Sequence, residues 1–349
     1  MQHSGQRAWR LLGALLALIP MAVSAPAAAA APHTTQSDDR GTVSWLVQPA
    51  GPLGGADVRT YLEHELQPGA SADDAIAITN HGESELTVRV FATDAFSDPR
   101  SGGFSLLPSG EAPRDAGAWV HLAASEVTIP ARATAEVPVV ISVPADAEPG
   151  DHAGGLVTAY TSDAVDQDGQ PVLLESRIAM RLYLQVAGER RPSLAVEDAW
   201  STFTPGAHQV TGTLRVAYTV RNTGNTRLGA DEDLRAQGPF GVGLRSPALS
   251  TVAELLPGDR VRREVVVEDV PAALALTTRI AVTPVDLRTG TELAPVVVTT
   301  GTSAVPWLAL LALVLLGTST GWVVRRRRRR WRALRAQLAA AGGATTPPS

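Results

Sequence analysis

The residues best suited to chemistry are a few histidines and many carboxylates, and one pair of them stands in an unusual setting. Asp151 and His152 directly follow Pro149-Gly150 and are followed closely by Gly154 and Gly155. An aspartate beside a histidine can help to shape a ligand site. The competing interpretation is a turn that enters a tightly packed strand, where the two glycines allow another backbone to approach closely. The pattern favours this second interpretation and leaves the first one open.

A second candidate site is the long segment from Asp94 to Gly117, which is rich in Gly, Pro, Ser and Asp. Long ordered loops on rigid scaffolds often carry binding residues. A sugar or a peptide could stack on Phe96, Phe104 or Trp119. The alternative, which we favour, is that these aromatic rings cap the core. The candidate ligand-binding residues predicted from the sequence are Asp94, Phe96, Phe104, Trp119, Asp151 and His152.

Patterns typical of catalysis and of metal binding are missing between residues 33 and 304. Two histidines spaced with a carboxylate as metal ligands do not occur, and the chain has no cysteine. A Gly-x-Ser-x-Gly pattern does not occur there either. A glycosidase needs two facing carboxylates, and nothing in the spacing singles out one pair among 35 acidic residues. We therefore predict no catalytic residues, no metal site, no cofactor and no enzymatic activity.

Apolar residues alternate with polar ones through most of residues 41–299. Such a period of two places one set of side chains on one face of a β-sheet, and frequent Pro and Gly residues separate the segments. Examples are Val137, Val139, Ile141 and Val143, and later Leu214, Val216, Tyr218 and Val220. The sequence predicts an all-β fold made of immunoglobulin-like β-sandwiches.

A weak internal repeat predicts two such sandwiches. A strand followed by an Asn-x-Gly turn occurs at Asn80-His81-Gly82 and again at Asn222-Thr223-Gly224. A charged break lies between them at residues 188–192. We expect a first domain over residues 41–187 and a second over residues 193–299, followed by a very short stalk at residues 300–304.

The two ends of the chain have membrane-related patterns. Arg7, Arg10 and the apolar run Leu11 to Val23 precede small residues, which predicts a signal peptide over residues 1–30. Residues 305–324 are apolar and long enough for a transmembrane helix, and residues 325–349 form a basic tail. The predicted anchor residues are Trp307 and Trp322 at the interfaces and Arg325, Arg326, Arg327, Arg328, Arg329 and Arg330 after the span.

The charge pattern predicts where each part lies. Cytoplasmic flanks are enriched in arginine, so we expect a single-pass type I protein with its bulk outside the cell and its tail in the cytoplasm. The tail also offers charges to anionic lipid. Between the two ends, 20 arginines face 35 acidic residues, which argues against nucleic acid as a partner.

Several segments resemble the WxL-interacting proteins of Gram-positive cell surfaces. They include Val43-Ser44-Trp45-Leu46-Val47-Gln48-Pro49, Leu66-Gln67-Pro68-Gly69, and the stretch from Pro144 through Asp151-His152 to Leu156. The resemblance implies a first domain that binds peptidoglycan, and partners that are WxL-type or other exported surface proteins.

The function predicted from these observations is a membrane-anchored, non-catalytic surface protein. It would bind cell-wall peptidoglycan, an exported protein, or both. The alternative is a structural scaffold whose sheet edge pairs with a strand of a secreted partner, without glycan binding. A wall-active hydrolase is the third and weakest possibility.

Overall fold

The computed structural model describes residues 43–50, 59–166, 169–239, 243–245, 249 and 251–342. The first ten strands are β1 (Trp45–Pro49), β2 (Leu62–Leu66), β3 (Ser71–Asn80), β4 (Leu86–Ser97), β5 (Phe104–Leu106), β6 (Val120–Leu122), β7 (Glu126–Ile129), β8 (Thr134–Ser142), β9 (Gly150–Val165) and β10 (Pro171–Val186), with a 3₁₀ turn η2 (Ala116–Trp119). The others are β11 (Leu194–Pro205), β12 (Thr211–Asn222), β13 (Leu228–Gln237), β14 (Gly243–Arg245), β15 (Val252–Leu255), β16 (Arg260–Pro271), β17 (Leu274–Asp286) and β18 (Val296–Ala304), before the helix α1 (Trp307–Gly342).

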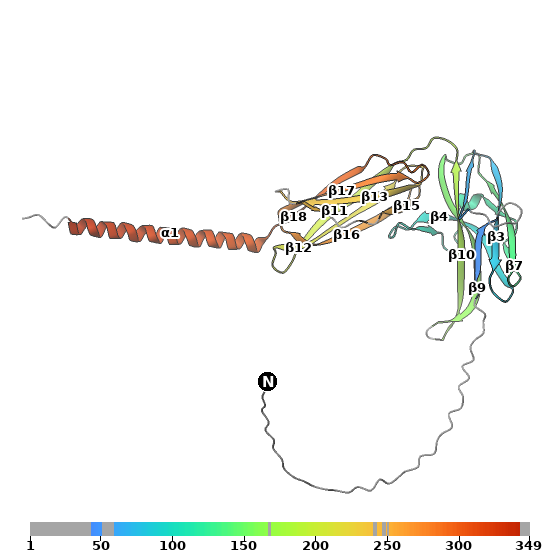
Figure 1. Ribbon diagram of the computed structural model, residues 1–349, viewed down its shortest axis with the longest axis horizontal. Helices are drawn as coiled ribbons and strands as arrows, with labels where there is room; N and C mark the ends of the chain where they lie inside the picture. The colour runs from blue at the N-terminus through green and yellow to red at the C-terminus, as the bar shows by residue number, and fades with distance from the viewer. Residues whose placement is uncertain are drawn as a thin grey trace, which may run out of the picture. The chain divides into compact units, whose positions relative to one another are not determined.

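Strands β1 to β10 form two sheets that enclose one core (Figure 1). One sheet has the order β1-β3-β8-β6, and the other has the order β2-β10-β9-β4-β5 with β7 also paired to β4. The alternation predicted from the sequence is confirmed in β8, where Val137, Val139 and Ile141 are buried and their neighbours are not. A sandwich results because each sheet buries one face against the other.

Strands β11 to β18 form a second pair of sheets with its own core. The orders are β11-β12-β16 and β14-β13-β17-β18, with β15 also paired to β13. Leu214, Val216, Tyr218 and Val220 of β12 point into this core. The protein is thus mostly β-sheet, as predicted, and the paired sheets fit the immunoglobulin-like β-sandwich. The division into two independent domains at residues 188–192 stays a prediction.

The internal repeat seen in the sequence has a structural counterpart. The side-chain amide of Asn80 donates to the backbone oxygens of Ser84 and Ile129, and its oxygen accepts from the amide of Gly82. Asn222 is its equivalent in the second sandwich: it donates to Thr226 and Leu255 and accepts from Gly224. Both side chains are buried, so each one closes a turn and links it to a neighbouring segment.

The C-terminal part differs from the prediction in two ways. Residues 300–304, predicted as a stalk, belong to β18, where they pair with β17. The helix begins at Trp307 and continues through the arginines to Gly342 instead of ending at residue 324.

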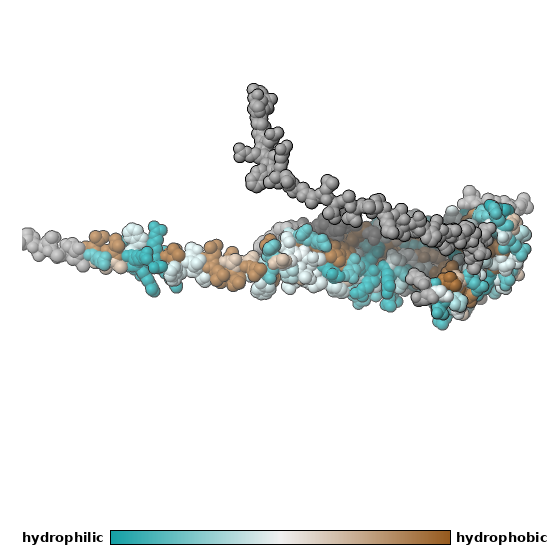
Figure 2. Space-filling view, turned by 90° about the horizontal axis from the view of Figure 1, so that it is seen from below, coloured by the Kyte–Doolittle hydropathy of each residue, from teal (hydrophilic) through white to brown (hydrophobic). Residues whose placement is uncertain are grey.

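The apolar part of α1 is long and apolar enough to cross a membrane. An 18-residue stretch of this helix has a mean hydropathy of 1.9, and none of that stretch is buried in the protein. Figure 2 shows a hydrophobic stretch of the helix followed by a hydrophilic band. The predicted signal peptide at residues 1–30 and the end of the tail after Gly342 lie outside the described residues.

Candidate functional site

Asp94, one of the predicted ligand residues, holds the chain that follows β5. Its carboxylate accepts hydrogen bonds from the backbone amides of Arg114, Asp115 and Gly117. Both oxygens are engaged in this way, and the carboxylate fixes the entry into η2.

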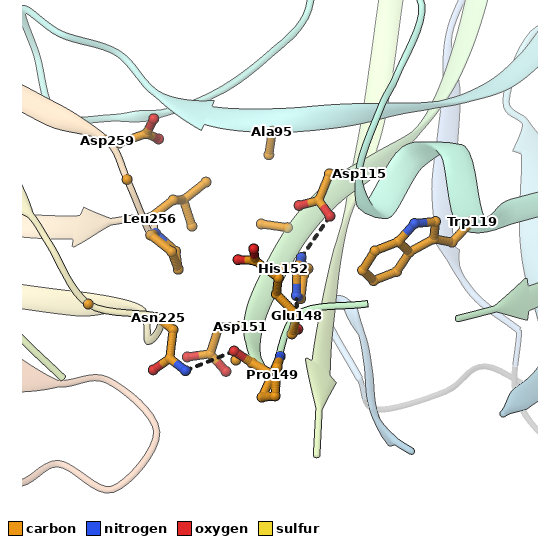
Figure 3. Close-up of a pocket in the computed structure, with 15 residues that line it drawn as sticks. Ala95, Asp115, Trp119, Glu148, Pro149, Asp151, His152, Asn225, Leu256 and Asp259 are labelled. Carbon is orange, nitrogen blue, oxygen red and sulfur yellow. Dashed lines mark hydrogen bonds and ion pairs between the residues drawn. The ribbon is translucent and has the colours of Figure 1, made fainter. Parts of the chain in front are cut away.

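His152 lies at the start of β9 with both ring nitrogens engaged. Nδ1 is 2.7 Å from Oδ1 of Asp115, and Nε2 is 2.9 Å from the backbone oxygen of Glu148 (Figure 3). Both partners accept hydrogen bonds, so the ring satisfies them only when each nitrogen carries a proton. Burial lowers the pKa of His152, but the hydrogen bond and the Coulomb attraction of Asp115 outweigh it and raise that pKa above its ordinary value.

Trp119 and Asp151 complete this neighbourhood. The Trp119 ring belongs to the first core, and its centroid is 4.7 Å from that of His152. The Asp151 carboxylate is buried and accepts from the backbone amide of Arg227 in the second sandwich. These side chains line a pocket of about 490 Å³ between the two sandwiches, together with Asp115, Asn225 and Asp259 (Figure 3).

Asn225 fastens the second sandwich to this pocket. Its side-chain amide donates to the backbone oxygens of Pro149 and Glu189, and its side-chain oxygen accepts from the amide of Arg191. Gly150 has φ +136°, and a Cβ there would lie 2.3 Å from the backbone oxygen of Asn225. This close approach therefore requires a glycine at position 150. The second interpretation of the segment named Gly154 and Gly155 instead, and a Cβ at Gly154 would lie 2.8 Å from the backbone oxygen of Thr93.

The long segment predicted to bind a ligand contacts the second sandwich instead. Its part from Ser97 to Gly103, here called the arm, joins β4 to β5. The Ser97 amide donates to the Asp259 carboxylate over 2.6 Å, and the amide of Leu256 donates to Ser97 Oγ. The amide of Arg262 donates to the backbone oxygen of Pro99 over 2.8 Å. The arm thus clamps one sandwich to the other.

Neither phenylalanine of this segment lines the pocket of His152. Phe104 packs against a small buried cluster of Ala153, Tyr183 and Leu256, with the Arg181 guanidinium 4.5 Å from its ring centroid. Phe96 lines a separate hollow of about 330 Å³ beside Arg221 and Arg260. The structure therefore brings Trp119, Asp151 and His152 together and does not add Phe96 or Phe104 to them. A ligand role for any of the six residues stays a prediction.

Sequence reasoning missed the feature with the clearest capacity for binding, which is the long hairpin of β9 and β10. The two strands pair along their whole length, from Pro171 with Val165 to Val186 with Gly150. On its other side, β10 is paired in parallel with β2, but only from Leu182 to Val186. No strand among the described residues pairs with that side of β10 between Pro171 and Arg181. Figure 1 shows the hairpin reaching past its neighbours.

One hydrogen bond shows which backbone groups of β10 point away from β9. The amide of Ala187, just after β10, donates to Leu66 of β2, so it points away from β9. Because backbone groups alternate along a strand and the register with β9 has no shift, the odd-numbered residues share this direction. The N–H and C=O groups of Leu173, Glu175, Arg177 and Ala179 thus point away from β9, toward the side of β10 on which β2 lies further along the strand. We call this row the β10 edge.

Large apolar side chains are exposed around the outer end of this edge. The exposed fractions are 71% for Val165, 40% for Val172, 74% for Leu173 and 55% for Leu174. Val172 and Leu174 continue the core-facing row of Ile178 and Met180 beyond the point where the core covers it. The feature of the sequence that could have predicted this exposed end is the apolar run Val172-Leu173-Leu174 beside a turn. The pattern of apolar residues alone would assign such a run to a buried strand.

The comparisons with known proteins correct the predicted family. No family model matches the chain, and no curated protein matches it. Solved structures with some likeness include the class 5 fimbriae chaperone CfaA, with a TM-score of 0.35, 10% identity and coverage of 74% of this chain and 99% of that one. The chaperone DraB of E. coli has a TM-score of 0.32, 8% identity and coverage of 73% and 98%. The Pseudomonas aeruginosa CupB2 chaperone has a TM-score of 0.28 and 10% identity, and the match covers 69% of this chain and 97% of that one.

The assignment to the WxL-interacting proteins was therefore wrong, because no family model and no curated protein matches the chain. The predicted binding of peptidoglycan is corrected with it, since it rested on that resemblance. The segment expected to hold the glycan is also occupied, because the arm contacts Leu256, Asp259 and Arg262.

Proposed function

We propose that this protein is a non-catalytic scaffold that binds an extended segment of another exported protein. The segment adds as a strand to the β10 edge. The observation that supports this proposal is the row of unpaired backbone groups from Leu173 to Ala179 among the described residues.

The protein already contains a strand that pairs with β10 in the manner proposed. β2 pairs in parallel with the inner part of the same side, from Leu182 to Val186. A partner segment would continue the row of β2 toward the tip of the hairpin. Strand addition of this kind takes affinity from backbone hydrogen bonds and specificity from alternate side chains.

Side chains on the two faces of β10 define what the partner strand must offer. Val172 and Leu174 lie on the core side, and both are exposed now. Apolar side chains on one face of the partner strand would cover them, with about 25 cal/mol gained per Å² of apolar surface removed from water. Glu175 and Arg177 lie on the other face, so the second set of partner side chains would be polar.

For the location of the protein, we infer that α1 crosses a membrane with Arg325 to Arg330 on the cytoplasmic side. The β-sandwiches then lie outside, where an exported partner is accessible. The exposed apolar part of α1 supports this inference. Trp307 and Trp322, which are exposed near the two ends of that apolar part, support it as well. Protease added to intact cells should digest the sandwiches and leave a fragment that contains α1 and the tail. Loss of the tail with intact sandwiches would reverse the orientation.

A proline at Ala179 tests the strand addition. Ala179 is exposed, and its N–H faces the free side, so Ala179→Pro removes one partner-facing donor and no hydrogen bond to β9. The matched control Ala179→Thr keeps the N–H and favours strand structure. A photo-crosslinking amino acid is placed at Leu173 of the full chain in the cells that make it, and at Val140 of β8 as a position control.

The expected result is one exported protein crosslinked from position 173 and not from position 140. Ala179→Pro should lower its yield about tenfold, while Ala179→Thr leaves it unchanged. Equal melting temperatures of the two variants show that both fold. Equal crosslinking yields from the two variants would overturn the proposal.

A further inference from the structure

A second strand edge lies on the other sandwich, on β16. This strand pairs with β12 on one side, from Arg260 with Arg221 to Pro271 with Thr211. On the other side, the amide of Arg262 donates to Pro99 of the arm. Arg262 therefore points its backbone groups away from β12, and alternation gives Glu264 and Val266 the same direction. We call the backbone groups of Glu264 and Val266 the β16 edge.

No strand among the described residues pairs with the β16 edge. The arm covers the position of Arg262 and goes no further, so the protein itself shows that this side of β16 accepts a backbone partner. Val266 is 45% exposed, although valine is a strand-forming residue with an apolar side chain. A groove of about 510 Å³ runs beside the edge and is lined by Val265, Val266 and Leu249 together with charged residues.

The charges of this groove are unequal. Its basic residues are Arg100, Arg262 and Arg263, and its acidic residues are Glu232 and Glu264. Glu232 is 2% exposed and pairs with Arg263, and Glu264 pairs with Arg215, which lies outside the groove lining. Arg100 and Arg262 make no ion pair within 4 Å among the described residues, and the recorded Coulomb attraction of Arg100 is to the fully exposed Asp98 of the arm. The two acids are thus engaged and two cations remain available, in a region whose overall sequence is strongly acidic.

We propose that the β16 edge and its groove form a second docking site, which takes an extended acidic segment of a partner protein. Backbone groups of the segment pair with Glu264 and Val266 in continuation of Pro99, and its carboxylates lie against Arg100 and Arg262. An apolar residue between the carboxylates would contact Val265 and Leu249. This site is on a different strand, sheet and sandwich from the β10 edge, and it does not depend on the function proposed for that edge.

Two synthetic peptides serve as probes, each blocked at both ends and labelled with a fluorophore. One has the sequence Thr-Glu-Val-Glu-Val-Glu-Val-Thr, and the other has lysine in place of each glutamate. Binding is followed by fluorescence anisotropy with the full chain in detergent micelles. The acidic peptide should bind about tenfold more tightly than the basic one, as expected for ion pairs partly shielded from water.

Three variants locate the site. Val266→Pro removes the outward N–H and should weaken binding of the acidic peptide about tenfold, whereas Val266→Thr keeps the N–H and should not. The double change Arg100→Glu with Arg262→Glu should reverse the preference, so that the basic peptide binds more tightly than the acidic one. This variant tests the site even if the proline variant does not fold. Ala179→Pro at the β10 edge should leave binding unchanged.

If the Val266→Pro and Val266→Thr variants are both folded and bind the acidic peptide equally well, this second site is overturned. It is also overturned if the double arginine variant still prefers the acidic peptide. If Ala179→Pro alone abolishes binding, the peptide occupies the β10 edge. That result would reject the second site and leave the function proposed for β10 intact.

Discussion

Side-chain amides and carboxylates hold the turns and loops of this protein in place through hydrogen bonds to the backbone. Asn80 and Asn222 each close an Asn-x-Gly turn, and the sequence predicted both turns because an Asn side chain readily caps the backbone two residues later. Asp94 and Asp151 were predicted as candidate ligand residues, yet both accept from backbone amides. Sequence could not show this, because the amides of Gly117 and Arg227 are brought to them only by the fold.

Replacement of either turn asparagine by alanine should destabilise one sandwich. Asn80→Ala leaves the buried oxygen of Ile129 without its donor, and Asn222→Ala does the same to the oxygen of Leu255. Each change should cost about 1–3 kcal/mol in the free energy of unfolding, measured by urea denaturation. Thr223→Ala in the second turn is the control, because it removes only a solvent-exposed hydroxyl hydrogen bond to Ser193 and should change little.

If the proposed division into two domains is right, Asn80→Ala shifts one unfolding transition and Asn222→Ala shifts another. A shift of a single common transition by both changes would show that the sandwiches unfold together. No loss of stability from either change would contradict the role assigned to the asparagines.

The titration of His152 has a defined sign. Its pKa in the folded protein is raised above the ordinary value, so the contact with Asp115 stabilises the fold at pH values below the unfolded pKa of about 6.5. That contribution is lost as the pH rises through the folded pKa. An NMR titration of the His152 ring should give a midpoint above the ordinary value, and Asp115→Asn should lower it. A midpoint at or below the ordinary value would refute the ion pair.

At the scale of elements, alternation and turn residues predicted the strands well, but they did not predict what each strand end contacts. The arm is part of the segment from Asp94 to Gly117, which the sequence predicted as one long loop, whereas the structure also contains the end of β4, β5 and the start of η2 in it. Its contacts, Leu256, Asp259 and Arg262, are more than 150 positions away in the chain, and no local pattern specifies such a pairing. The β10 edge was missed for a similar reason, since pairing depends on where β2 ends.

The arm should hold the two sandwiches together through Ser97. Its Oγ accepts from the amide of Leu256 in a buried setting, so Ser97→Ala removes one interaction worth about 1 kcal/mol. Hydrogen exchange at the Leu256 amide should become several-fold faster in this variant. Ser105→Ala in β5 is the control, because the Ser105 hydroxyl makes no hydrogen bond to any residue that the structure describes. Unchanged exchange in the Ser97 variant would show that the arm rests on the second sandwich without clamping it.

At the scale of the whole molecule, the sequence predicted a β-rich protein with a membrane-spanning helix near its end, because both follow from the spacing of apolar residues. It assigned the wrong family, because short motifs in a β-sandwich reflect turn chemistry that many sandwiches share. The partner-binding scaffold was the alternative to glycan binding. Among the described residues, no strand pairs with the outer part of β10, and this property of the assembled sheet now makes the scaffold the better interpretation.

Amide hydrogen exchange along β10 tests the strand addition most directly. In the full chain alone, the amides of Glu175, Arg177 and Ala179 should exchange much faster than those of Ser176, Ile178 and Met180, which bond to β9. In the complex recovered through position 173, the fast amides should become protected. Odd-numbered amides that are protected before the partner binds, or that stay fast after it binds, would contradict the addition of a strand to the β10 edge.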